Sequence, residues 1–131
     1  MRRRDLQRVI GALVVAIGIY LVLSPLTVAA VLARPHETSS QLINLRASWG
    51  GPVLGLGAFL VWSPGLRPWS RTVLGLLLWS MAGIGLARTI GFVVDGAPDT
   101  RQWIWLTLEV AIVIGAAFGL RVFARRSSTR A

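Results

Sequence analysis

Four charged residues of this chain could carry chemistry, because they lie in or beside long apolar runs. Arg88 and Glu109 each interrupt such a run, whereas Arg46 and Asp95 lie near the ends of runs. A charge inside a membrane costs a few kcal/mol even on lenient insertion scales, so such a residue usually has a partner. The planar guanidinium group of arginine can bind two oxygens of a phosphate or carboxylate at once. These residue types therefore indicate ion pairing or the binding of a small polar group.

The depths of Arg88 and Glu109 in their runs predict that the two side chains meet. At ~1.5 Å per residue, Arg88 lies roughly 9 Å before the end of its run, and Glu109 lies roughly 10 Å after the beginning of the next one. Asp95 lies two turns beyond Arg88 on the same helix face, and Arg46 falls at the boundary of an earlier run. We expect all four side chains to converge in one pocket in the outer half of the protein.

Two interpretations of this charged cluster stay open. In the first, the pocket is open to the outside and binds a small polar or anionic ligand or the head group of a membrane lipid, as a minor transport component would. In the second, Arg88 and Glu109 form a desolvated ion pair that fixes the register of two helices and does nothing else. The second interpretation suits a structural or accessory subunit that packs against another membrane protein.

Other kinds of chemistry have little support in the residue inventory. One histidine and no cysteine cannot form a usual zinc site, so we expect neither a metal nor a cofactor. Asp95 and Glu109 are the one carboxylate pair that could do acid–base work, and burial beside arginine perturbs carboxylates without any catalytic purpose. We therefore expect no enzymatic activity. The 14 basic residues are all arginines that alternate with apolar runs instead of forming one stripe, which argues against a nucleic-acid partner.

The elements that must position these residues are long apolar helices. The chain has 131 residues, of which 54% are hydrophobic and only 15% charged, whereas soluble domains average ~25% charged. A helix needs about 20 apolar residues to cross a bilayer, and the chain has four runs near this length. We expect one membrane domain over residues 1–131, an all-α four-helix bundle whose helices cover roughly residues 9–32, 42–62, 72–94 and 102–123.

The distribution of arginine predicts the orientation, since cytoplasmic loops carry the excess of positive charge. With the N-terminus inside, ten arginines lie on the inner side and three on the outer side. Both termini are therefore expected in the cytoplasm, with a multi-pass protein in the cell membrane. The first apolar run is longer than the ~7 to 15 residues of a signal peptide, so we expect the mature protein to retain it.

Rows of small residues predict where the helices touch, because such residues let backbones approach closely in lipid. The rows have a spacing of four and are Gly51 and Gly55; Gly83, Ala87 and Gly91; and Ala111, Gly115 and Gly119. We expect them to pack within the bundle. The alternative is homodimerisation through one of these faces.

Several short motifs of the chain resemble a known family. They are Leu45-Arg46-Ala47-Ser48-Trp49-Gly50-Gly51, Ala87-Arg88-Thr89-Ile90-Gly91, Asp95-Gly96-Ala97-Pro98 and Leu108-Glu109. Together they are similar to the bacterial four-helix membrane family known as domain of unknown function 4345. The resemblance implies an integral membrane protein of four helices with no established activity, and it singles out Arg46, Gly50, Gly51, Arg88, Gly91, Asp95, Gly96, Pro98 and Glu109.

Overall fold

A computed structural model describes residues 3–63, 65 and 68–128, and the side chains up to residue 125. All regular structure in these ranges is helical, and they contain no strand. The elements are α1 (Arg3–Leu23), α2 (Pro25–Leu32), α3 (Ser39–Leu45), the π-helical segment η1 (Arg46–Gly50), α4 (Gly51–Trp62), α5 (Trp69–Val94) and α6 (Thr100–Ser128).

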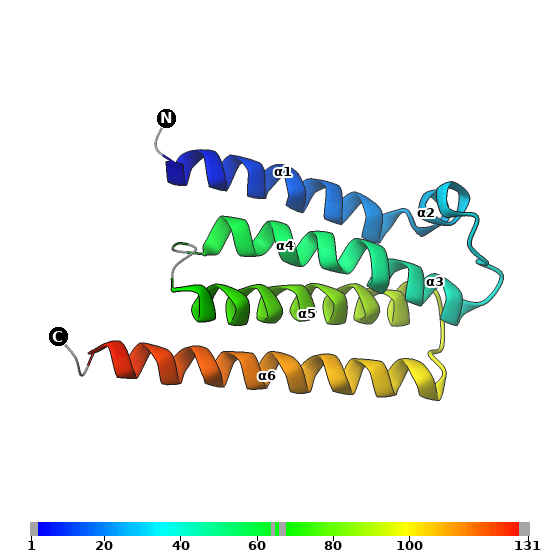
Figure 1. Cartoon of the computed structure of the whole chain (residues 1–131). Helices are drawn as coiled ribbons and strands as arrows, with labels where there is room; N and C mark the ends of the chain where they lie inside the picture. Colours follow the sequence, from blue (N-terminus) through cyan, green and yellow to red (C-terminus); the bar gives the residue numbers. More distant parts are fainter. Residues whose placement is uncertain (1–2, 64, 66–67, 129–131) are drawn as a thin grey trace.

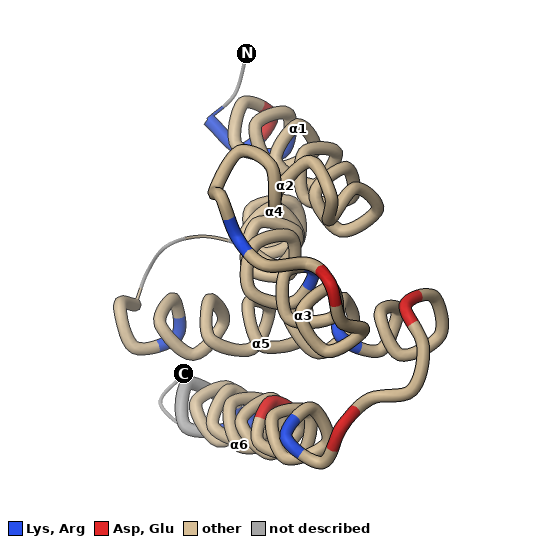
Figure 2. The backbone as a smooth tube through the Cα atoms, turned by 90° about the vertical axis from the view of Figure 1, so that its right-hand side faces the viewer, with Lys and Arg blue, Asp and Glu red and all other residues tan. Residues whose placement is uncertain are grey.

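The long helices are stacked in chain order. Helix α1 packs on α4, α4 packs on α5, and α5 packs on α6 (Figure 1). Seen from one end, the helices form a row in which α5 is tilted across its neighbours (Figure 2). Because the row does not fold back on itself, α4 and α6 both lie on α5 instead of packing extensively on each other.

The first apolar run is two helices and not one. A single helix over residues 9–32 was expected, but α1 ends at Leu23 and α2 begins at Pro25. Proline lacks an N–H group, and its ring disfavours the helical conformation of the preceding residue. Ser24 accordingly has φ −120° and ψ 60°, outside the helical region. The prediction was wrong here because the proline interrupts the helix although the run stays uncharged.

The second run is helical from Ser39 to Trp62, which is longer than the predicted 42–62 and is divided by η1. Thr38 begins it with a capping box, in which the N–H of Gln41 donates to the Thr38 hydroxyl at 3.3 Å. The π-helical geometry of η1 follows from Pro52, because proline has no N–H group to donate to the carbonyl four residues earlier. The N–H of Gly51 instead donates to the carbonyl of Arg46, five residues back.

The third and fourth runs form α5 and α6, close to the predicted 72–94 and 102–123. Helix α6 begins earlier than expected because Asp99 caps it. The N–H of Gln102 donates to Oδ1 of Asp99 at 2.9 Å. An aspartate at this position satisfies a backbone donor that the first turn of a helix leaves free.

The outer surface of the chain is apolar, as expected for a membrane protein. In the described part, α1, α5 and residues 100–125 of α6 are long and apolar enough to cross a membrane. Large apolar side chains project outward from them, and Leu13, Val93 and Phe118 are 62%, 83% and 69% exposed. Water does not tolerate so large an apolar surface on a monomer, whereas lipid does.

Glycines set the spacing of the first three helices in the row. A Cβ at Gly18 would lie 2.5 Å from the backbone of Leu54, and one at Gly51 would lie 2.6 Å from the Cα of Ile84. Helix α4 is therefore in backbone contact with α1 on one side and with α5 on the other. The predicted packing of the small residues on α5 is confirmed: Gly83 contacts Gly51 and Gly55, Ala87 is fully buried, and Gly91 lies against Ile43.

The small-residue row of α6 does not follow this pattern. Ala111 and Gly115 are exposed, and a Cβ at Gly115 would meet nothing within 4 Å. Only Gly119 approaches α5, where a Cβ would lie 3.1 Å from the Leu74 side chain. The expectation that the whole row packs within the protein was wrong, because the buried positions of α6 lie on another face, at Gln102, Glu109 and Ala116.

Candidate functional site

The first ion pair, between Arg46 and Asp95, joins three helix ends. Nε of Arg46 lies 2.7 Å from Oδ2 of Asp95, and its Nη2 lies 2.8 Å from Oδ1. The remaining group, Nη1, donates to the carbonyl of Val22 in the last turn of α1. Carbonyls in a last helical turn need partners outside the helix, and a cation there also favours the helix dipole. Arg46 therefore holds the end of α1 against η1 and the end of α5.

The second ion pair, between Arg88 and Glu109, joins α5 to α6. Nη2 of Arg88 lies 2.8 Å from Oε1 of Glu109, and its Nε lies 3.1 and 3.2 Å from the two carboxylate oxygens. Their side chains are only 4% and 7% exposed. The two residues pair, as their equal depths predict.

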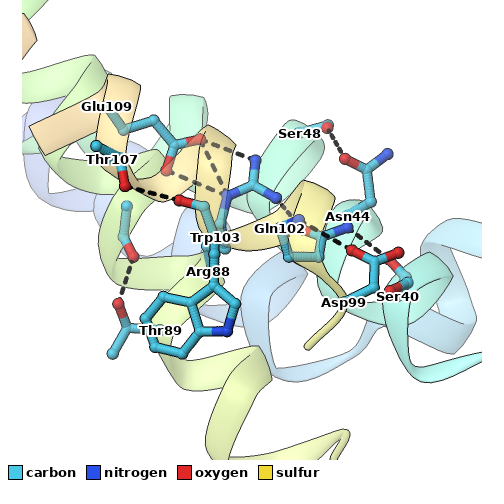
Figure 3. A network of polar contacts seen from close by, with 11 residues as sticks. Ser40, Asn44, Ser48, Arg88, Thr89, Asp99, Gln102, Trp103, Thr107 and Glu109 are labelled. Carbon is cyan, nitrogen blue, oxygen red and sulfur yellow. Dashed lines mark hydrogen bonds and ion pairs between the residues drawn. The ribbon is translucent and has the colours of Figure 1, made fainter. Parts of the chain in front are cut away.

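Gln102 extends this pair into a network that reaches a third element (Figure 3). Its Oε1 accepts a hydrogen bond from Nη1 of Arg88, and its Nε2 donates to the carbonyl of Ser40 in α3 at 3.2 Å. Gln102 was not among the site residues predicted from the sequence. The spacing could have found it, because Gln102 lies seven residues before Glu109, on the same face of α6.

Asp99 lies at the loop end of the same network. The backbone N–H of Gln102 and the side chain of Ser40 donate hydrogen bonds to its carboxylate, and the charge of Arg101 is close. These interactions hold the pKa of Asp99 below its ordinary value, since each favours the ionised form. Asp99 therefore keeps a negative charge beside the exposed Arg101 throughout the neutral range.

A cleft of about 870 Å³ lies beside the network, and we call it the α4–α6 cleft. Residues of α3, η1 and α4 form one wall, residues of α6 and the loop before it form the other, and α5 forms the floor. The lining residues are Ser40, Gln41, Asn44, Ser48, Pro52, Met81, Ile84, Arg88, Asp99, Arg101, Gln102, Trp105, Leu108, Glu109 and Ile112. The cleft follows from the row arrangement, because α4 and α6 both pack on α5 and not extensively on each other.

A stripe of uncharged polar residues on the first wall was likewise not among the predicted site residues. Ser40, Asn44 and Ser48 line the cleft at intervals of four residues. A spacing of four keeps side chains on one helix face, so the pattern was visible in the sequence. The hydroxyl of Ser48 donates to the side-chain oxygen of Asn44 at 3.3 Å. These groups give the cleft donors and acceptors that are exposed to an occupant.

The four predicted site residues do not converge in one pocket. Arg88 and Glu109 line the α4–α6 cleft, whereas Arg46 and Asp95 line a second cavity of about 380 Å³ at the junction of α1 and α2. The expectation was wrong because Asp95 lies beyond the end of α5, where the carbonyl of Val22 and the carboxylate together hold Arg46. The structure thus separates the cluster into two neutral pairs.

The motif glycines and Pro98 have positions that explain their residue types. A Cβ at Gly50 would lie 2.6 Å from the Val22 side chain, so Gly50 permits the contact between η1 and α1. Gly96 has φ +110°, a conformation that only glycine adopts readily. Pro98 is half-buried in the connection between α5 and α6. These residues shape the elements around the two pairs and do not line the cleft.

Comparison with known families confirms the resemblance found in the motifs. The chain matches the family described as Domain of unknown function (DUF4345) over residues 6–120. The matched range contains both ion pairs and every residue that lines the cleft. No curated protein and no solved structure matches the chain.

Proposed function

We propose that this chain, which belongs to the DUF4345 family, binds a small polar ligand or the head group of a membrane lipid in the α4–α6 cleft. One observation carries the proposal. The buried network of Arg88, Glu109 and Gln102 forms part of the wall of an open cleft of about 870 Å³, more than twice the volume of the cavity of about 380 Å³ beside Arg46 and Asp95. Ionisable groups inside a membrane protein commonly mark a ligand pathway or site.

The proposal includes a four-helix bundle in the plasma membrane of a bacterium, with both termini in the cytoplasm. The helical run from Ser39 to Trp62 would be the fourth crossing, because at ~1.5 Å per residue it is roughly 35 Å long and the hydrocarbon core is about 30 Å thick. Both ends of the described chain lie at the same ends of the long helices, on the left in Figure 1, in agreement with an even number of crossings. The polar end of the cleft would then face the outside.

Reporter fusions test this topology. A reporter that is active only in the cytoplasm should be active after residue 131 and inactive in the connection between α2 and α3. An external C-terminus would overturn the orientation and, with it, the outward-facing cleft.

We further propose that the protein binds without catalysing a reaction and without a cofactor. The buried charges of the cleft are partnered with each other, since Arg88 is held by Glu109 and Gln102. Charged groups that are already paired can still form hydrogen bonds with a ligand at the rim of the cleft. Such contacts are typical of a binding protein or of a minor transport component.

A cleft-filling variant tests the binding function. Ser48→Phe would place a ring in the cleft from an exposed position, and Thr107→Phe would place the same ring on an exposed position of α6 that does not line the cleft. The full chain is purified in detergent, and co-purified small molecules and lipids are identified by native mass spectrometry. Ser48→Phe should lose a bound species that the wild type and Thr107→Phe retain. Equal retention in all three proteins would contradict the proposal.

The exposed Ala111 and Gly115 favour a second candidate, an accessory subunit of another membrane protein. Small residues on a lipid-facing surface allow a partner helix to approach closely, and in the described structure nothing covers Gly115. Arg88 and Glu109 would then be structural only. In this case Gly115→Leu should remove a co-purifying membrane protein, while Ser48→Phe should leave that protein bound.

A further inference from the structure

Resting on the binding function proposed above, we infer that the occupant of the α4–α6 cleft is a zwitterionic phospholipid, with a phosphate and an amine in its head group. The polar head would lie between Arg101 and Asp99 at the loop end, and one acyl chain would lie along α5. The polarity, length, charge and side opening of the cleft support this assignment.

Polarity changes in the same direction on all sides of the cleft. On the first wall, Ser40 and Asn44 are followed by Pro52; on the floor, Arg88 is followed by Met81 toward the middle of α5. The α6 wall begins with Arg101 and Gln102 and continues with Leu108 and Ile112. Glu109 is a charged residue in the apolar part of the α6 wall, and its charge is paired with Arg88. A ligand with a polar head and an apolar tail matches this arrangement, and a small polar molecule would leave the apolar half unfilled.

The length of the cleft agrees with one leaflet of a bilayer. Arg101 and Ile112 both lie in α6, and at ~1.5 Å per residue they are separated by roughly 16 Å along the helix. Half of a hydrocarbon core of about 30 Å is ~15 Å. A lipid whose head group lies at the membrane interface would therefore place its acyl chain beside the apolar half of the cleft. The acyl chain would keep the depth that it has in the surrounding bilayer.

The charges of the cleft favour a zwitterion over an anion. Among the described lining residues, Arg88 and Arg101 are positive and Asp99 and Glu109 are negative. Arg88 and Glu109 neutralise each other, so that Arg101 and Asp99 remain at the rim for the head group. Arg101 would bind the phosphate and Asp99 the ammonium group. An anionic head without an amine would place a phosphate beside the negative charge of Asp99 with no positive group to offset it, which is unfavourable.

The sides of the cleft also suit a lipid that enters from the membrane. Helices α4 and α6 pack on α5 and not extensively on each other, and the cleft between them is open. A phospholipid could place one chain in the cleft while its second chain stays in the bilayer. A soluble ligand has no need of such a side opening.

The test compares three probes on the full chain, purified in detergent and stripped of lipid. These are phosphatidylethanolamine, phosphatidylglycerol and soluble phosphoethanolamine, and binding is measured by native mass spectrometry and by the shift in Tm. Phosphatidylethanolamine should bind roughly three- to five-fold more tightly than phosphatidylglycerol, the range of one exposed charge contact. Phosphoethanolamine should bind far more weakly than the lipid, because it lacks the chain that fills the apolar half.

Charge variants at the rim show whether the preference arises in the cleft. Asp99→Asn should abolish the preference for phosphatidylethanolamine, and asparagine still caps α6. Arg101→Gln should weaken the binding of both lipids by a similar three- to five-fold factor. Glu37→Gln and Arg34→Gln are the matched controls, since they remove the same charges from exposed positions outside the α4–α6 cleft. Both controls should behave like the wild type.

The outcomes separate this inference from the function on which it rests. If Ser48→Phe leaves the binding of every probe unchanged, the α4–α6 cleft is not a binding site and both proposals fail. If Ser48→Phe blocks binding but phosphatidylglycerol binds as tightly as phosphatidylethanolamine, the zwitterion assignment alone fails. If phosphoethanolamine binds as tightly as the lipid, the ligand is a free polar molecule, and again only the lipid assignment fails.

Discussion

The two buried ion pairs of this chain have the same chemistry in different surroundings. Arg46 and Asp95 join three helix ends beside a cavity of about 380 Å³, and the second partner of the arginine is a main-chain carbonyl. Arg88 and Glu109 lie beside the larger α4–α6 cleft of about 870 Å³, and the second partner of that arginine is the side chain of Gln102. The two pairs are almost equally buried. Burial and pairing alone therefore do not identify a ligand site, and the difference between the pairs lies in the size and the lining of the cavity beside each one.

The helix contacts explain why the cleft forms at the second pair. On the α4 side of α5, Gly51, Gly55 and Gly83 bring the two backbones together. On the α6 side, the charged network holds one end of α6, and Gly119 lies against the Leu74 side chain farther along the helix. Because α4 and α6 both pack on α5 and not extensively on each other, a cleft remains between them.

Removal of Arg46 should have the largest effect on stability. Arg46→Leu leaves the carboxylate of Asp95 and the carbonyl of Val22 without their partner in a buried site, which typically costs about 3 to 5 kcal/mol. Unfolding in detergent measures this loss, with the exposed Arg34→Leu as the control. The folded fraction of Arg46→Leu should bind lipid like the wild type. A loss of lipid binding without a loss of stability would instead place Arg46 and Asp95 in the binding site.

The second pair should show strong coupling in a double-mutant cycle. Arg88→Leu and Glu109→Leu should each destabilise the protein by about 3 kcal/mol, because each leaves one buried charge unpaired. The double variant should recover much of this loss while still failing to bind the ligand. Losses that add within a few tenths of a kcal/mol would show that the two residues do not interact.

Loss of Gln102 should have a smaller effect on stability and a specific effect on binding. Gln102→Leu removes the hydrogen bonds to Arg88 and to the carbonyl of Ser40, so we expect a loss of about 1 to 2 kcal/mol. Gln7→Leu is the matched control, since Gln7 donates to the carbonyl of Leu60 on the other side of α4. Both variants should unfold more easily in denaturant, and only Gln102→Leu should bind lipid less tightly. Equal binding by both would remove Gln102 from the site.

The smallest expected effect is the pH dependence caused by Asp99. Its folded-state pKa is lowered from 3.8, so its contribution to stability is complete above the unfolded pKa and is lost as the pH falls through the folded pKa. The difference in Tm between the wild type and Asp99→Asn should be constant above pH ~5 and should shrink below pH ~4. A difference that grows on acidification would contradict the capping role of Asp99.

Much of this arrangement could be predicted from the sequence. Apolar run lengths give the helices, and the equal depths of Arg88 and Glu109 give their contact, because both depend on regular helix geometry. The family resemblance likewise depends on short local motifs. The α4–α6 cleft itself was not predictable in this way, since it follows from the tertiary packing of α4 and α6 on either side of α5.

The missed features have physical reasons as well. Pro25 was visible, but the absence of charge in the first run hid the break that it causes. The place of Arg46 depends on where α1 ends, and that end determines which carbonyl the guanidinium can reach. The segment η1 depends on Pro52 and on close glycine contacts, which a count of apolar residues does not include.

Occupation of the α4–α6 cleft can be measured by cysteine protection, because the chain has no cysteine of its own. Ser48→Cys places a thiol in the cleft, and Thr107→Cys places one on an exposed position of α6 outside it. The rate of reaction with a water-soluble maleimide is measured in detergent with and without phosphatidylethanolamine. The lipid should slow the reaction of Ser48→Cys and leave that of Thr107→Cys unchanged. Equal rates with and without the lipid at Ser48→Cys would show that the cleft stays empty and would contradict its role as the binding site.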